Sequence, residues 1–185
     1  MNKQKNSTRF IAYTAMGLAL VFVAQLLGKL IGSRVPIYGP FSLTQLISGS
    51  LVNCVLLVFT ALAGVWSGVI ISVLSPVLAF AFGIQPQPFM IPVIALGNAI
   101  LCLVYVLLAK KLQLPALVAV IAAAVVKCGF FWLTVPHLVK LFVAEGPQLK
   151  ALPIMFSWPQ GVTALLGGLL ALVIIKRLQK TEYAK

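Results

Sequence analysis

The chain has 185 residues, of which 62% are hydrophobic and only 9% are charged, and its formal net charge is +12. Soluble domains carry about a quarter charged residues, so the composition predicts one integral membrane domain covering residues 1–185. The cations cluster at the ends of apolar segments, where phospholipid headgroups lie, which indicates a membrane partner and no nucleic acid. Two acidic residues, Glu145 and Glu182, are too few for a relay of buried carboxylates or for two-carboxylate catalysis.

The apolar runs predict an all-α membrane protein with six transmembrane helices, because about 20 apolar residues span a bilayer. The expected helices cover about residues 9–31, 43–62, 65–82, 89–109, 116–138 and 158–176. We interpret the first as a retained helix, since no clear small-residue cleavage site follows it. The long run from 43 to 82 is expected to break near Ala63–Gly68. The fifth run could continue to Ala144, but Pro136 is expected to kink or end it.

The connections 32–40, 83–88 and 145–157 are rich in glycine and proline, as turns are. With six spans both termini lie on one side. Nine cations fall on that side and four on the other, so the positive-inside rule predicts cytoplasmic termini. The nine are Lys3, Lys5, Arg9, Lys110, Lys111, Lys176, Arg177, Lys180 and Lys185, and the four are Lys29, Arg34, Lys140 and Lys150.

Chemistry-bearing residues are scarce. Three cysteines, Cys54, Cys102 and Cys128, lie inside apolar segments without C-x-x-C spacing, so we interpret them as packing residues. A single histidine, His137, cannot hold a metal without further ligands. The sequence has no phosphate-binding loop and no nucleophile or paired-carboxylate motif. We therefore expect neither an enzyme nor a bound metal or cofactor, and no ATP hydrolysis by this chain.

Lys127 is the exception among the cations, because it lies about 17 Å into the fifth helix, near the bilayer centre. A cation at that depth costs several kcal/mol unless it meets a partner, water or a ligand. No carboxylate of the chain lies at its depth. Three interpretations remain: Lys127 snorkels to an interface, bonds carbonyls and amides such as Asn98, or meets an anionic or carbonyl-rich ligand.

A few polar and aromatic residues in the outer halves of the spans have the composition of a small-molecule site, which combines an apolar lining with a few convergent polar groups. Asn98 is the strongest candidate, because an amide about nine residues into a span needs partners. Each of the others also has an ordinary explanation, as a helix cap or an interfacial aromatic residue. The candidate ligand-binding residues are Asn98, Lys127, Trp132, Gln160, Trp158, Gln45, Phe89 and Gln25. Of these, Trp132 is expected to touch a ligand held by Lys127.

Small residues recur at helical spacing in three segments, where they allow two helices to approach closely. For two of them we interpret the pattern as packing within the bundle: Gly64 and Gly68, and the stripe of Gly161, Ala164, Gly168 and Ala171. For Ala15 and Ala19 on the first helix, docking of a partner subunit is equally open.

Along essentially its whole length, the chain resembles the substrate-binding S components of energy-coupling factor (ECF) vitamin transporters. The resemblance rests on length, six spans, cytoplasmic termini and the segment Thr8–Ala19 with its Ala-x-x-x-Ala pattern. The segments Ala95–Asn98 and Met155–Gln160 also look like stretches of Firmicute members.

The resemblance implies a multi-pass protein in the plasma membrane of a Gram-positive bacterium. Such a subunit binds a micronutrient from outside under a lid formed by the first outer loop. It then associates with a membrane T component and two ATPases, which use the ATP, and topples to release the ligand inside. In S components, alanines of the first helix contact the T component, so the resemblance implies this role for Ala15 and Ala19. The ligand is not specified; pantothenate, a queuosine precursor or a cobalamin would suit Lys127 and the amides. The alternative is a stand-alone small membrane carrier or channel for an organic solute.

Overall fold

A computed structural model describes residues 2–31, 36–85 and 87–182 of the chain. The described part is almost entirely helical. The helices are α1 (Asn2–Ile31), α2 (Leu43–Ala63), α3 (Val65–Ala81), α4 (Met90–Val106), α5 (Ala116–Phe142), α6 (Gln148–Met155) and α7 (Trp158–Glu182). A π-helical turn, η1 (Leu107–Lys111), extends α4, and an antiparallel pair of short strands, β1 (Pro36–Tyr38) and β2 (Phe41–Ser42), precedes α2.

The long helices have the dimensions of membrane spans. Five helical segments are long and apolar enough to cross a bilayer: 7–30, 43–63, 90–111, 116–142 and the combined α6–α7 segment 148–180. The remaining predicted span, α3, has 17 residues and is about 26 Å long, slightly less than the hydrocarbon core of about 30 Å. The chain is therefore a multi-pass membrane protein by its helices, with five clear spans in the described part and a shorter sixth apolar helix.

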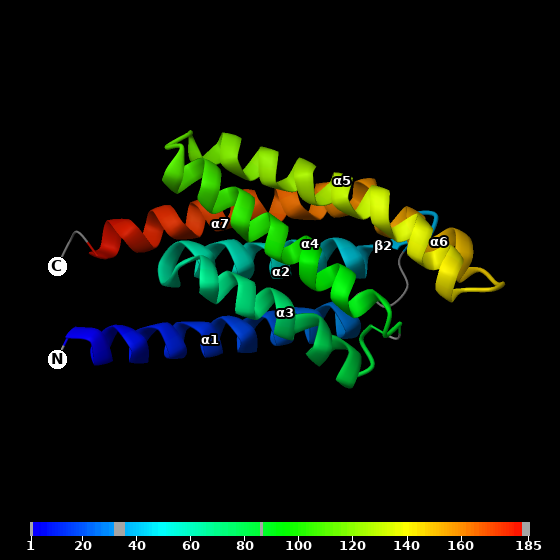
Figure 1. Ribbon diagram of the computed structural model, residues 1–185, viewed down its shortest axis with the longest axis horizontal. Helices are drawn as coiled ribbons and strands as arrows, with labels where there is room; N and C mark the ends of the chain where they lie inside the picture. Colours follow the sequence, from blue (N-terminus) through cyan, green and yellow to red (C-terminus); the bar gives the residue numbers. More distant parts are fainter. Residues whose placement is uncertain (1, 32–35, 86, 183–185) are drawn as a thin grey trace.

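The long helices run roughly alongside one another, and both ends of the chain lie at the same end of the bundle (Figure 1). Helix α2 is central, packing against α1, α3, α4 and α7, while α5 packs against α4, α6 and α7. The short strands, α6 and the α3–α4 connection lie at the opposite end, called here the distal end. The proximal end, which holds the termini, also carries the α2–α3 and α4–α5 turns.

Two apolar clusters fill different parts of the bundle. The larger is built on α2, α4, α5 and α7 and includes Leu56, Leu57, Leu101 and Val120, all fully buried. The smaller lies distally between α4, α5 and α6, around Met90, Phe131 and Val139. The half of the bundle nearest the termini is therefore tightly packed.

Glycines allow the closest helix contacts. A Cβ atom on Gly167 of α7 would collide with the backbone carbonyl of Ser50 on α2, and one on Gly168 would collide with Val120. The contact of Gly168 and the full burial of Ala164 and Ala171 confirm the prediction that this stripe serves packing within the bundle, and Gly167 adds a closer contact that was not predicted. Gly64, with φ +96°, separates α2 from α3 at the predicted break, and Gly68 packs against Thr60 and Cys102.

Several predicted boundaries were wrong. Helix α5 does not end at Pro136 but continues to Phe142, because the proline removes only one backbone hydrogen bond while Val135 and Val139 remain buried in the distal cluster. The expected connection 145–157 contains α6, whose Leu152 packs into the same cluster. Helices α1 and α7 also extend beyond the predicted spans, to Asn2 and Glu182. Residues 32–35 and 86 of the predicted loops, and Lys185 of the charge count, lie outside the described residues.

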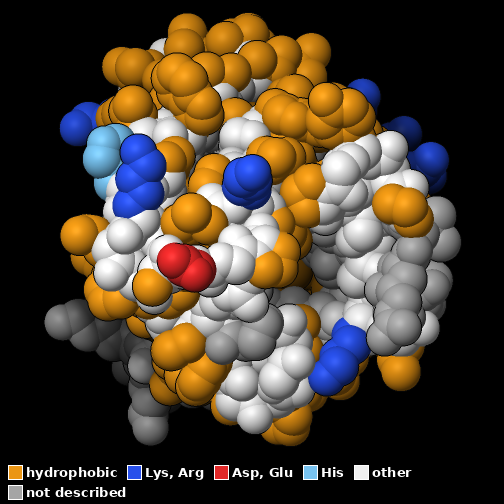
Figure 2. Space-filling model, turned by 90° about the vertical axis from the view of Figure 1, so that its right-hand side faces the viewer, with side chains coloured by type: hydrophobic (Ala, Val, Ile, Leu, Met, Phe, Trp, Pro, Cys, Tyr) orange, Lys and Arg blue, Asp and Glu red, His pale blue; other side chains and the backbone are white. Residues whose placement is uncertain are grey.

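The distal surface differs from the sides of the bundle. Figure 2 looks onto it and shows polar side chains and backbone among patches of hydrophobic residues, with isolated Lys or Arg side chains. Lys29, Lys140, Lys150, His137 and Glu145 are all exposed. This end is therefore suited to water and headgroups, whereas α1, α5 and α7 expose many large hydrophobic side chains along their lengths.

Candidate functional site

Lys127 is almost fully buried, with 1% of its surface exposed, and its amine finds hydrogen-bond partners inside the bundle. Its Nζ donates to the Oδ1 atom of Asn53 at 2.5 Å and to the Oδ1 atom of Asn98 at 2.7 Å. The ring centroid of Phe131, one turn further along α5, lies 5.8 Å from Nζ. Of the three interpretations of Lys127, bonding to amides such as Asn98 is confirmed and snorkelling was wrong, while contact with a ligand stays a prediction.

The three helices that hold this cluster fix its geometry. Asn53 lies midway along α2, and Asn98 lies midway along α4. An ammonium group has no acceptor, so each asparagine must turn its oxygen towards Lys127 and its NH₂ group elsewhere. The Nδ2 atom of Asn53 lies 3.5 Å from Thr163 Oγ1 on α7. Four helices therefore meet at one polar layer inside an otherwise apolar bundle.

This polar layer is the floor of a cavity of about 390 Å³ that extends towards the distal end. Its walls come from α1 to α7 and from the α3–α4 connection, and amide side chains predominate among the polar groups. The residues that line it are Gln25, Gln45, Ser48, Gly49, Val52, Asn53, Pro76, Ala79, Ile84, Gln85, Gln87, Ile94, Asn98, Lys127, Phe131, Gln148, Ala151, Leu152, Met155, Phe156 and Gln160.

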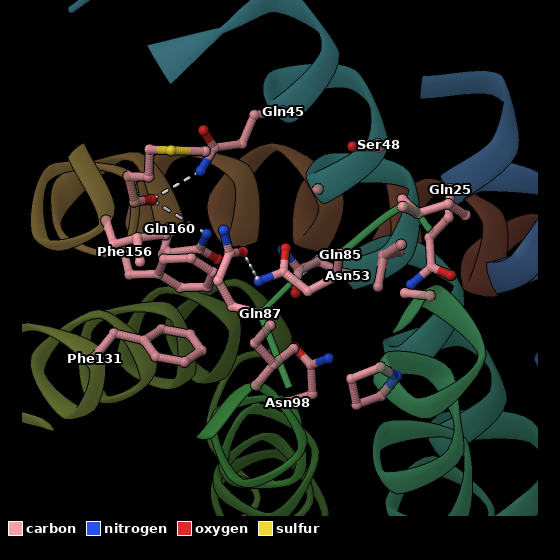
Figure 3. Close-up of a pocket in the computed structure, with 18 of the residues that line it drawn as sticks. Gln25, Gln45, Ser48, Asn53, Gln85, Gln87, Asn98, Phe131, Phe156 and Gln160 are labelled. Atoms are coloured by element: carbon pink, nitrogen blue, oxygen red, sulfur yellow. Dashed lines mark hydrogen bonds between the residues drawn. The ribbon is translucent and has the colours of Figure 1, made fainter. Parts of the chain in front are cut away.

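The amides converge on the cavity from several elements, with Phe131 and Phe156 on one side (Figure 3). The Nε2 atoms of Gln45 and Gln160 approach the backbone carbonyl oxygen of Met155, at 2.8 Å and 3.4 Å. This shared carbonyl joins α2, α6 and α7 around the cavity wall. The rings of Phe131 and Phe156 pack edge to face with centroids 5.5 Å apart. The site thus combines a flat apolar wall with many hydrogen-bonding groups, as small-molecule sites do.

The α3–α4 connection covers the cavity near its distal opening. Gln85 donates from Nε2 to Oε1 of Gln87 at 3.1 Å, and both side chains line the cavity. Lys29, at the end of α1, approaches the carbonyl oxygens of Phe82 and Gly83 at 3.4 Å and 3.3 Å. The end of α1 is therefore tied to the connection that forms the cavity rim.

Five of the eight predicted ligand-binding residues line the cavity: Gln25, Gln45, Asn98, Lys127 and Gln160. Trp132, Trp158 and Phe89 are not part of its wall. Trp132 is 66% exposed, because it follows Lys127 by five residues and so lies on another face of α5. The residue that shares the face of Lys127, one turn on, is Phe131.

The other two predicted aromatic residues, Trp158 and Phe89, also lie outside the wall of this cavity. The Trp158 ring packs edge to face on Phe41, with centroids 5.3 Å apart, and near Tyr38 at 6.0 Å. It supports the strand pair instead of the cavity. Phe89 stacks on Phe142 at 5.2 Å and borders a separate hollow between α4 and α5.

Asn53 is the most important residue that sequence reasoning missed. It lies in an unbroken apolar run, as Asn98 does, so the signal of a mid-span amide was present. Gln85, Gln87 and Gln148 were also missed as site residues, because polar residues in connections are ordinary. Only the folded chain brings them over the cavity.

Ala15 and Ala19 lie on the exposed face of α1, together with Met16 and Leu20. The bundle-facing side of this helix instead uses Gly17, which packs against Phe59 and Ile71. The two alanines are therefore available to a partner, whereas the glycine is used internally. No family model, curated protein or solved structure matches this chain.

Proposed function

We propose that this chain is the substrate-binding S component of an ECF-type importer, which captures a small polar micronutrient from the outer face of the plasma membrane. The observation that carries the proposal is the cavity itself. Its wall includes α6 and the α3–α4 connection, which lie at the end of the bundle opposite the termini, and amide side chains line it around the buried Lys127.

The shape of the interior favours binding over conduction. The cavity ends at the layer of Asn53, Asn98 and Lys127, and the larger apolar cluster fills the bundle between that layer and the proximal end. A solute that reaches the floor meets packed Leu, Val and Cys side chains. Release on the other side then requires a large movement of the whole subunit, which is what the partner-driven toppling of S components supplies.

The charge distribution supports the orientation. The proximal end carries Lys110, Lys111, Lys176 and Arg177, all exposed, in addition to the cations of the terminal segments. The positive-inside rule assigns such an end to the cytoplasm, so the cavity would face outwards.

The exposed face of α1 supports partner docking. Ala15 and Ala19 present a flat strip to which a helix of a T component could approach closely. Large exposed apolar residues such as Met16 and Leu20 border the strip. We propose that this face contacts the T component and that two ATPases complete the importer.

Replacement of Ala15 and Ala19 by tryptophan tests this function. Denaturation of the isolated subunit releases the small molecule that it retains, and a labelled form of that molecule serves as the probe. In proteoliposomes that contain a T component, two ATPases and ATP, the double variant should lose uptake while the isolated subunit keeps its affinity. Unchanged uptake by the double variant would contradict the proposal. Uptake by the chain alone, without ATPases, would establish the stand-alone carrier instead.

A further inference from the structure

The floor of the cavity holds the amine of Lys127 without a carboxylate counter-ion. Both partners of Lys127 Nζ are neutral amide oxygens, those of Asn53 and Asn98. The entire chain has two acidic residues. Glu145 is exposed in the α5–α6 turn at the distal surface, and Glu182 is the last residue of α7 at the other end. Neither can neutralise a cation midway along α5.

The same floor has unused hydrogen-bond donors. Two of the three N–H bonds of Lys127 are directed at the asparagines, which leaves one for an occupant of the cavity. Asn98 is 4% exposed and lines the cavity, and within the described part of the chain its NH₂ group donates no hydrogen bond. An ammonium and an amide NH₂ beside one another form a binding site for an oxyanion.

The number of charges limits the kind of anion. Lys127 is the only cationic residue in the cavity wall of the described chain, and the other polar groups there are amides and a serine hydroxyl. Lys29, at the end of α1, is engaged with the backbone carbonyls of Phe82 and Gly83, which do not belong to the wall. One cation balances one negative charge, whereas a phosphate monoester would bring nearly two. The arrangement therefore favours a carboxylate.

We propose that the ligand is a small monocarboxylate, bound with its carboxylate on Lys127 Nζ and Asn98 Nδ2 at the cavity floor. Its remaining polar groups meet the glutamine amides nearer the opening, and its flat or apolar part lies against Phe131 and Phe156. This inference rests on the proposed function of the cavity as a capture site, and it adds the charge and the orientation of the captured molecule.

The test begins with identification of the ligand. The detergent-solubilised chain is incubated with a small-molecule extract of cells and washed, and the retained molecule is released and identified by mass spectrometry. Esterification with methanol should add one methyl group to it, which reports one carboxyl group. A retained molecule without a carboxyl group would overturn this proposal and leave the capture function standing. Retention of no molecule would overturn both.

The decisive measurement compares the affinities of the acid and of its methyl ester. Loss of a buried charge partner should weaken ester binding by about 30-fold or more in the wild-type chain. In Lys127→Met the acid and the ester should bind about equally, and in the control Lys140→Met, an exposed distal cation, the preference for the acid should persist. Equal affinities in the wild type, or an undiminished preference in Lys127→Met, would overturn the proposal.

A second variant covers the case in which Lys127→Met does not fold. Asn98→Asp gives Lys127 a carboxylate partner within the protein, so this variant should fold. The new carboxylate neutralises Lys127 and takes the place that the ligand's carboxylate would occupy. The preference for the acid over the ester should disappear in this variant. Persistence of the full preference in Asn98→Asp would contradict the assigned orientation.

Discussion

At the scale of single residues, the account depends on how Lys127 is tolerated at its depth. The side chain is buried inside the bundle, with 1% of its surface exposed, and its Nζ donates to two amide oxygens from different helices. Hydrogen bonds to a charged group contribute about 1.5–3 kcal/mol each, more than bonds between neutral groups. The cluster should therefore hold α2, α4 and α5 together as well as form the floor of the cavity.

This coupling can be measured with a double-mutant cycle on Asn53→Ala and Lys127→Met. Each single variant leaves a buried polar partner unsatisfied and should lower stability, while the double variant removes both partners together. The stability losses should fall short of additivity by about 1–3 kcal/mol. Denaturation in detergent micelles gives the three values. Strictly additive losses would mean that the two residues stabilise the bundle independently.

At the scale of the helices, close packing depends on small residues on the inner faces of α1 and α7. Gly167 faces the backbone of α2, where the neighbouring atom is a main-chain carbonyl that cannot rotate away. Ala164 and Ala171 on the same face of α7 are fully buried. The α2–α7 contact is thus fixed by backbone proximity, and it positions Asn53 against Thr163 at the cavity floor.

Gly167→Ala should consequently destabilise the protein by several kcal/mol, because the added methyl group forces α2 and α7 apart. The matched control is Gly129→Ala in α5, where a Cβ atom meets nothing within 4 Å. That change should raise stability by about 0.5–1 kcal/mol through its effect on backbone entropy. Thermal unfolding in detergent distinguishes them. A Gly167→Ala variant as stable as Gly129→Ala would show that the α2–α7 contact is looser than described.

At the scale of the whole molecule, the two ends of the bundle have different chemistry. The termini lie at one end, and α6 and the strand pair lie towards the other (Figure 1). The exposed Lys110, Lys111, Lys176 and Arg177 belong to the end with the termini, whereas α6 and the α3–α4 connection help to line the cavity. The α4–α5 turn with Lys111 and the α5–α6 turn with Glu145 are exposed at opposite ends. These turns provide reporters of orientation.

Single cysteines at these two positions, in a variant whose native cysteines are replaced by alanine, should react differently with a membrane-impermeant maleimide. Glu145→Cys should label in intact cells, and Lys111→Cys only after permeabilisation, because the positive-inside rule predicts that Lys111 lies in the cytoplasm. The reverse pattern would turn the cavity towards the cytoplasm and contradict capture from outside.

Much of this architecture was predictable from the sequence, because apolar runs of about 20 residues leave few alternatives to spanning helices. The break near Gly64 followed from the same reasoning, and Asn98 was one of the partners considered for Lys127, whereas Asn53 was missed. The continuation of α5 through Pro136 did not follow, since the burial of Val135 and Val139 against other helices stabilises it. Nor did α6, whose Leu152 is buried only in the folded chain.

The candidate site was predictable only in part, and for a geometric reason. Depth along a helix can be read from the sequence, which identified Asn98 and Lys127. Helical spacing also places Phe131, four residues after Lys127, on the face of that lysine, so the expectation for Trp132 overlooked a signal that the sequence contained. Gln85 and Gln148 enter the wall through the paths of connections, for which the sequence carries no periodic signal.

The central claim is that the cavity retains a small molecule in the isolated chain, and native mass spectrometry tests it most directly. Ala151 lines the cavity from α6, so Ala151→Trp should fill part of the cavity from the side of α6 while Lys127 is left unchanged. The wild-type chain should carry one bound small molecule, and Ala151→Trp should have the mass of the bare chain. A wild-type chain without bound mass, or the same bound mass in both proteins, would contradict the account.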